Sequence, residues 1–192
     1  MNNPKIILIG GVNGSGKTTI AKALSKRLGI PHRIGIGFMR ESIKAFISKE
    51  QEPLLYSHSF KAFEIAGGSI ENGFRKQTKL ISLPVNACIT RAQYEGTGLI
   101  IEGTQLLPEF VPKEIFLVFL FPDKTCNHYD RIHGKDTHSK RKVIKEEFDG
   151  IKKIEKYLIK QAKKHDVPII FNANVEETVE KIIELWGDKN GT

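Results

Sequence analysis

The sequence is poor in cysteine and tryptophan and has no long hydrophobic run. Its two cysteines, Cys88 and Cys126, lie far apart, and neither has the spacing of a metal site. We therefore expect free thiols in a reducing compartment rather than a disulfide framework. No apolar stretch approaches the roughly 18 residues of a membrane span. The early apolar run 6–9 is too short for a signal-peptide core, so we expect a cytoplasmic protein without a membrane partner.

The composition is that of a folded domain with an excess of positive charge. The chain has 192 residues, of which 40% are hydrophobic and 27% charged, and its net charge is +8. This length suits one domain over 1–192. Residues 131–164 hold twelve Lys or Arg against five Asp or Glu. Such a surface suits nucleic acid, membranes or small anions, or is simply a solvated helix face, and charge alone does not choose.

Short apolar runs alternate with helical patterns along the chain, which predicts a parallel sheet with helices on both faces. The expected strands are 5–9, 32–36, 98–102, 115–121 and 168–172. The expected helices are 17–28, 39–49, 53–66, 74–94, 125–133, 139–165 and 176–186. In such α/β sheets, ligands bind beyond the carboxyl ends of the strands, where we therefore expect the site.

The first expected strand runs into a phosphate-binding motif. The spacing from Gly11 to Lys17 and Thr18 is that of Walker A, which predicts a P-loop NTPase fold that binds ATP with Mg²⁺. Glycines let successive backbone N–H groups face the phosphates, and the following helix adds its positive end. Lys17 is expected to reach the β- and γ-phosphates, and the Thr18 hydroxyl to bind Mg²⁺. The predicted nucleotide-binding residues are Gly11, Val12, Asn13, Gly14, Ser15, Gly16, Lys17, Thr18 and Thr19.

The third expected strand ends in a carboxylate, Glu102. An acid at the end of a strand neighbouring the P-loop is suited to orient the Mg²⁺ shell, and we predict this role for Glu102. The alternative is an ordinary strand-end acid that faces solvent.

Two further segments suggest an acceptor site like that of nucleoside-monophosphate-type kinases. Residues 53–96 form a longer helical excursion than a crossover needs, which suggests an insertion that covers a substrate. Residues 131–142 are polar, basic and interrupted by Gly134, and we interpret them as a mobile lid between two helices.

The chain resembles the archaeal 2-phosphoglycerate kinase family. The resemblance rests on an ordered set of segments that covers nearly the whole chain. They are 9–22, 39–44, 56–62, 73–77, 100–108, a basic stretch from Arg131 to Arg141, and 167–172. The resemblance implies a kinase that adds a phosphoryl group to a small, already phosphorylated hydroxy acid.

The resemblance also implies roles for individual residues. Arg40 would contact the anionic group of the acceptor; Ser57, His58 and Lys61 would line its pocket, and Gln77 would hydrogen-bond it. Arg131 and Arg141 would be lid arginines that neutralise the transferring phosphoryl group together with Lys17. For each acceptor residue, a plain surface role is the alternative.

One stretch departs from the family pattern. The resemblance leads us to expect a Thr-Asp pair before Met39, but the chain has Gly37 and Phe38 there. An acid that would touch the acceptor hydroxyl is thus absent. Phosphoryl transfer depends mainly on positioning and charge neutralisation, so activity remains compatible with this change. A more apolar acceptor, mevalonate 3-phosphate, phosphorylated on its 5-hydroxyl, is therefore an alternative to 2-phosphoglycerate.

Two other classes of function stay open. A nucleic-acid 5′-end kinase would explain the basic charge, but no interleaved aromatic and basic stripe supports it, so we expect no nucleic-acid partner. A nucleotide-binding regulator would need no acceptor site. The six histidines, His32, His58, His128, His133, His138 and His165, form no metal spacing. The sequence leaves a monomer and a homodimer equally open.

Overall fold

The computed structural model describes residues 4–133 and 145–190. A five-stranded parallel sheet lies at its centre, in the order β2-β3-β1-β4-β5. The strands are β1 Ile6–Gly11, β2 His32–Gly35, β3 Leu99–Glu102, β4 Phe116–Pro122 and β5 Ile169–Asn172. Each strand lies within two residues of its predicted bounds, which confirms the expected sheet.

The helices follow the predicted order with two exceptions, a break within 53–66 and a 3₁₀ turn at 108–110 that was not predicted. They are α1 Lys17–Leu28, α2 Ile36–Lys44, η1 Pro53–Tyr56, α3 Ala62–Ala66, α4 Ile70–Glu95, η2 Pro108–Phe110, α5 His128–His133, α6 Lys145–Lys164 and α7 Val175–Asn190. The prediction of a single helix over 53–66 is wrong, because the 3₁₀ turn η1 and the short helix α3 are separated by residues 57–61. Helix α2 also begins and ends earlier than the predicted 39–49.

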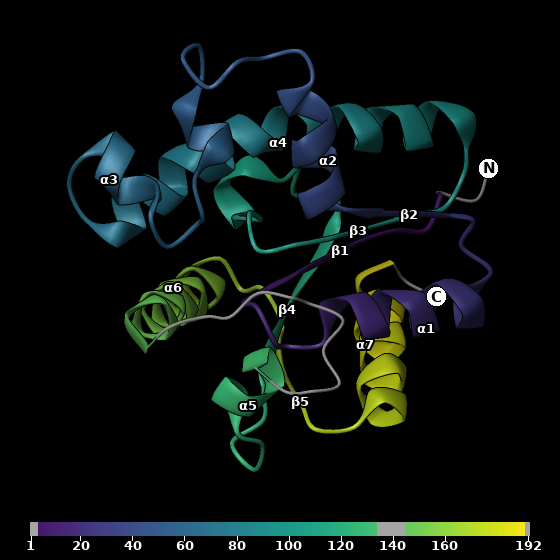
Figure 1. Cartoon of the computed structure of the whole chain (residues 1–192). Coiled ribbons are helices and arrows are strands. Elements are labelled where there is room, and N and C mark those ends of the chain that lie inside the picture. Colours follow the sequence, from purple (N-terminus) through teal and green to yellow (C-terminus); the bar gives the residue numbers. More distant parts are fainter. Residues whose placement is uncertain (1–3, 134–144, 191–192) are drawn as a thin grey trace.

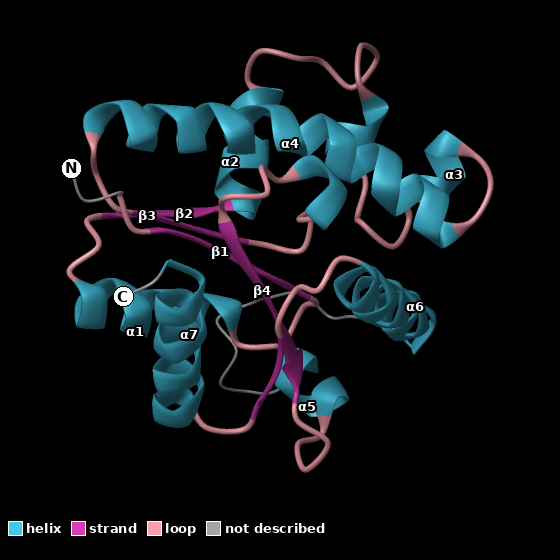
Figure 2. Cartoon of the chain, turned by 180° about the vertical axis from the view of Figure 1, so that it is seen from behind, coloured by secondary structure: helices cyan, strands magenta, loops and turns pink. Residues whose placement is uncertain are grey.

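Helices cover both faces of the sheet. Helices α2, α4 and α6 lie on one face, and α1 and α7 lie on the other (Figures 1 and 2). Alternate residues of β1 point to opposite faces of the sheet. Ile6 and Leu8 belong to the apolar cluster beneath α2, α4 and α6, and Ile7 and Ile9 belong to the cluster beneath α1 and α7. The strand is buried throughout, which explains why its sequence is continuously apolar.

The longest helix that the structure describes, α4, lies on the face of the sheet that also carries α2 and α6. Its N-cap Ser69 accepts a hydrogen bond from the Asn72 N–H, and Gly96 ends it in the left-handed conformation. A stripe at spacings of three and four residues is buried: Phe74, Thr78, Ile81, Val85 and Ile89. Among the helices that the structure describes, none is both long and apolar enough to cross a bilayer.

Because all strands are parallel, their carboxyl ends meet at one edge of the sheet. Gly11 ends β1, Glu102 ends β3 and Asn172 ends β5 at this edge. The loop between β1 and α1 begins there as well, so the fold gathers the predicted site residues Gly11 and Glu102, together with Asn172, which was not predicted, around one loop.

Candidate functional site

The loop between β1 and α1 is curled in a way that requires glycine. Gly14 and Gly16 have φ angles of 77° and 87°, in the left-handed region. A Cβ atom on Gly16 would also lie 2.4 Å from the amide nitrogen of Asn172. Helix α1 starts at Lys17 directly after this curl, so its unpaired N–H groups face the loop. The loop has the form of an anion cradle at a helix N-terminus.

The side chain of Lys17 is folded into this cradle. It is buried, and its Nζ donates a hydrogen bond of 2.6 Å to the carbonyl of Val12. Burial lowers the pKa of Lys17 from 10.5 to about 8, while the negative charge of Glu102 acts in the opposite direction. The cradle therefore holds a desolvated cation that an anionic ligand would stabilise.

A hydroxyl and a carboxylate meet beside the cradle. The Thr18 hydroxyl donates a hydrogen bond of 2.9 Å to Oε1 of Glu102. Glu102 stands at the end of β3, between Ile9 of β1 and Gly35 of β2 in the strand register. These two oxygen ligands fit Mg²⁺, which prefers hard oxygen donors and usually keeps several waters. The prediction that Thr18 and Glu102 act together thus has a geometry that suits it.

A residue that the sequence analysis did not single out fixes the back of the loop. The Asn172 amide is buried; its Nδ2 donates to the Ser15 carbonyl at 2.9 Å, and its Oδ1 accepts from the Thr178 hydroxyl at 3.0 Å. Arg131 of α5 donates to the Asn172 carbonyl at 3.2 Å. The only sequence signal for Asn172 was its place at the end of the last apolar run. Arg141, the other predicted lid arginine, lies outside the described residues.

Three predicted acceptor residues come together between α2 and α4. Arg40 and Gln77 both donate to the carbonyl of Ser57, at 3.1 and 2.9 Å. Gln77 also donates to the Leu54 carbonyl at 2.8 Å and accepts from Gln105 at 3.1 Å. Its side chain is fully buried, so its amide holds the loop around Ser57 in place instead of facing a ligand.

The other two predicted acceptor residues lie in the same loop but have different partners. The His58 ring stacks on Phe60 with 5.4 Å between the ring centroids. Lys61 forms a 2.8 Å ion pair with Glu147 of α6, and this pairing raises the pKa of Lys61. Lys61 therefore joins the inserted segment to α6.

The position of the expected acid is occupied by an exposed aromatic ring. Phe38 is 83% exposed on the first turns of α2. A Cβ atom on Gly35 would lie 3.6 Å from the Phe38 ring and 3.2 Å from Oε1 of Glu102. The ring thus borders the carboxylate at the carboxyl edge of the sheet, where the family pattern leads one to expect a second carboxylate.

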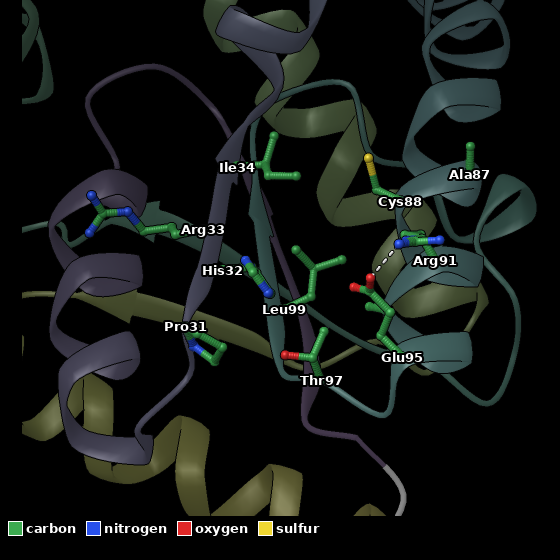
Figure 3. A pocket seen from close by; sticks show the side chains of 11 residues that line it. Pro31, His32, Arg33, Ile34, Ala87, Cys88, Arg91, Glu95, Thr97 and Leu99 are labelled. Atoms are coloured by element: carbon green, nitrogen blue, oxygen red, sulfur yellow. Dashed lines mark hydrogen bonds and ion pairs between the residues drawn. The ribbon is translucent and has the colours of Figure 1, made fainter.

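A separate cavity of about 560 Å³ lies between β2, β3 and α4 (Figure 3). Ile34, Cys88 and Leu99 contribute to its lining, and Arg91 and Glu95 form an ion pair on its helical side. His32 and Leu99 begin their strands, so the cavity lies toward the amino ends of the sheet and away from the P-loop. Although this cavity is large, its position away from the P-loop means that it is not the phosphate site.

Comparisons with known proteins agree with this geometry. A family model described as an AAA domain matches residues 7–153. The chain is 37% identical to the 2-phosphoglycerate kinase of Pyrococcus horikoshii over 96% of its length, and 34% identical to that of Methanococcus maripaludis over 94%. It spans 64% of the length of each of these curated relatives.

Solved structures show the same fold at low sequence identity. Shikimate kinase from Acinetobacter baumannii, in complex with shikimate, superposes with a TM-score of 0.60 at 17% identity and covers 96% of this chain and 93% of its own. Thymidylate kinase from Candida albicans gives 0.57 at 14% identity and covers 99% and 94%. The predicted P-loop fold of the nucleoside-monophosphate-kinase type is thereby confirmed.

Proposed function

Because the chain belongs to the AAA-domain family of P-loop proteins and is related over nearly its whole length to archaeal 2-phosphoglycerate kinases, we propose that it is an ATP-dependent kinase with 2-phosphoglycerate as its acceptor. The observation that carries the proposal is the Thr18–Glu102 pair beside the glycine cradle. A P-loop with this pair suits phosphoryl transfer from a magnesium nucleotide. The names of the relatives favour 2-phosphoglycerate, and they give no support to mevalonate 3-phosphate.

In this proposal, separate groups of residues would bind the phosphates and Mg²⁺. The cradle N–H groups and Lys17 would hold the phosphates, and Thr18 with Glu102 would hold Mg²⁺. Bound MgATP would supply the phosphoryl group, and its Mg²⁺ would offset part of the negative charge of that group. Lys17 would leave the Val12 carbonyl for the phosphates, which replaces a neutral partner by an anionic one and strengthens the interaction.

The acceptor would enter from the side of α2 and the loop around Ser57. The guanidinium of Arg40 and the Phe38 ring both belong to α2. Arg40 suits an anionic group of the acceptor, because a guanidinium can bind carboxylate or phosphate through two parallel hydrogen bonds. Without a carboxylate at position 38, the Glu102 carboxylate is the acid of the described site that lies next to the Thr18 hydroxyl.

The direct test is ATP consumption with Mg²⁺ in the presence of 2-phosphoglycerate, with mevalonate 3-phosphate and no acceptor as comparisons. We expect 2-phosphoglycerate to stimulate ADP formation and the product to carry two phosphoryl groups on glycerate. Stimulation by mevalonate 3-phosphate alone would replace the substrate while keeping the reaction class. ATP binding without stimulation by either would favour the regulator reading, and steeply salt-dependent oligonucleotide binding would favour a nucleic-acid kinase.

The variant Glu102→Gln tests the site itself. Its side-chain oxygen can still accept the Thr18 hydrogen bond, but the negative charge is lost. We expect the Mg²⁺ concentration for half-maximal activity to rise at least about tenfold, with little change in thermal stability. The control is Glu109→Gln, which removes a carboxylate that pairs with Arg75 at a distance from the cradle. An equal Mg²⁺ requirement in both variants would contradict the role of Glu102.

A further inference from the structure

A histidine outside the predicted site holds the P-loop from behind. His128, the first residue of α5, is buried, and its Nε2 lies 2.7 Å from the carbonyl oxygen of Asn13. The ring also packs on the loop, because a Cβ atom on Gly14 would lie 3.1 Å from its Cδ2. A carbonyl can only accept a hydrogen bond, so Nε2 must carry a hydrogen.

The other ring nitrogen faces a carboxylate. His128 Nδ1 lies 3.6 Å from Oε2 of Glu155 on α6. Both atoms are buried, and neither has a hydrogen-bond partner among the residues that the structure describes. The second oxygen of Glu155 accepts a short hydrogen bond from Lys152, one turn earlier in α6.

Proton counting gives this contact two states. With Nε2 protonated, a neutral ring presents a lone pair at Nδ1, so two acceptors face each other across the gap to Glu155. One proton taken up from solution on Nδ1 changes the contact into a charge-assisted N–H···O pair. Loss of that proton to solvent removes the hydrogen bond and leaves an unpaired buried acceptor on each side, which is costly.

The surroundings of the ring favour its neutral form. Burial lowers the pKa of His128, Lys152 and Arg131 act in the same direction, and Glu155 and the Asn13 carbonyl oppose them. The Phe148 ring also packs on the imidazole, edge to face, with 5.3 Å between the ring centroids. The proton is therefore lost below the ordinary pKa of histidine, on the acidic side of neutrality.

We propose that His128 is a positioning residue that sets the P-loop backbone through the Asn13 carbonyl, and that a proton shared with Glu155 makes this support pH-dependent. The proposal rests on the nucleotide-binding part of the proposed function. The protonated pair holds the ring firmly between α6 and the loop. The deprotonated pair pushes the ring and the carboxylate apart, which weakens the support of the cradle and hence the binding of the nucleotide.

Glu155→Gln gives the sharpest test, because its amide can donate to the neutral Nδ1 and needs no added proton. We would measure the dissociation constant of MgATP by calorimetry at pH 5.5, 6.5, 7.5 and 8.5, without an acceptor. Dividing the dissociation constant of the wild type by that of the variant at each pH cancels the contributions from titration of the ligand and of Lys17. We expect this ratio to rise about fivefold from pH 5.5 to pH 8.5, the effect of about one hydrogen bond.

Two other variants separate positioning from general damage. His128→Gln can keep an N–H for the Asn13 carbonyl, but its side chain does not titrate. The dissociation constant of MgATP for this variant should therefore lack the pH-dependent rise expected of the wild type. Glu146→Gln removes an exposed carboxylate of the same helix and should run parallel to wild type. Parallel curves for wild type and Glu155→Gln would overturn the positioning proposal alone. Absence of MgATP binding by the wild type at every pH would overturn the proposed function and this proposal with it.

A spectroscopic measurement checks the tautomer directly. Ring ¹⁵N shifts, assigned with His128→Gln, should show Nε2–H as the neutral form of His128 in the wild type. Glu155→Gln should lower the titration midpoint of the ring, because the carboxylate that stabilises the imidazolium is gone. A neutral ring protonated on Nδ1 would contradict the donor assignment and overturn the proposal.

Discussion

Individual residues of the P-loop are arranged for a ligand at the expense of stability. Lys17 shows this most clearly, because a buried ammonium with a lowered pKa is unfavourable until an anion arrives. In the unfolded chain the same group keeps its ordinary pKa of 10.5. Between pH 8 and 10.5 the unfolded state therefore binds more protons than the folded state, so stability rises with pH over this window.

We predict that Lys17→Met abolishes the proposed kinase activity and raises the stability of the ligand-free protein at pH 7. The shift from 10.5 to about 8 corresponds to at most about 3 kcal/mol. Loss of the bond to the Val12 carbonyl offsets about 1 kcal/mol of this gain. Denaturant unfolding should thus show a gain of about 1–2 kcal/mol at pH 7 that shrinks toward pH 10.

The exposed Lys22 on the same helix provides the matched control. Lys22→Met should leave both activity and the pH dependence of unfolding close to wild type. If Lys17→Met is destabilised equally at pH 7 and pH 10, the lysine is not held as a strained cation, and its hydrogen bonds dominate instead.

At the scale of elements, the sequence predicted the strands and the first helix well, because their signals are local. The residues of β1 form a continuous apolar run, and α1 has glycines at both ends, Gly16 and Gly29. The prediction failed at 53–66, where apolar residues at helical spacing continue across a real break. That break is fixed by hydrogen bonds from Arg40 and Gln77 to the Ser57 carbonyl, and no local pattern shows such contacts.

The same limit applies to the site. Lys17, Thr18 and Glu102 were predictable because a motif and a strand end identify them. Asn172 and His128 act on the loop from β5 and α5, more than a hundred residues away in sequence. Their partners are backbone carbonyls, which leave no trace in residue types, so the sequence alone could not assign them.

The joint between α4 and the Ser57 loop can be tested as an element. We predict that Gln77→Met, which keeps the side-chain length but removes the amide, raises the KM for the acceptor at least about threefold and leaves the KM for ATP near wild type. The Leu54 and Ser57 carbonyls and the Gln105 amide would each lose a hydrogen bond, and the Ser57 carbonyl would keep the one from Arg40. The free energy of unfolding should fall by about 2 kcal/mol.

Lys79→Met introduces the same side chain at an exposed position of the same helix and should change neither constant. An equal rise of both KM values in Gln77→Met would indicate that the loop supports the whole site, and that it has no specific connection to the acceptor.

On the scale of the whole molecule, the two apolar clusters share one sheet. Neighbouring residues of β1 belong to opposite clusters, so neither face can lose its helices without exposing the back of the other. Trp186, the single tryptophan, packs with the cluster of α1 and α7 and reports on that face. Helices α4 and α6 lie on the opposite face and contribute much of the helical signal.

We predict one cooperative unfolding transition, in which Trp186 fluorescence and far-UV circular dichroism give the same midpoint. Ile89→Ala removes buried volume on the α4 face only. If the sheet couples both faces, this variant lowers the free energy of unfolding by about 2–4 kcal/mol in both signals. MgATP at about 100 times its dissociation constant should raise the free energy of unfolding measured by either signal by about 2.7 kcal/mol. A helical signal that falls before the fluorescence changes would mean that α4 and the inserted segment unfold as a separate unit, and that the chain holds two folding units in place of one.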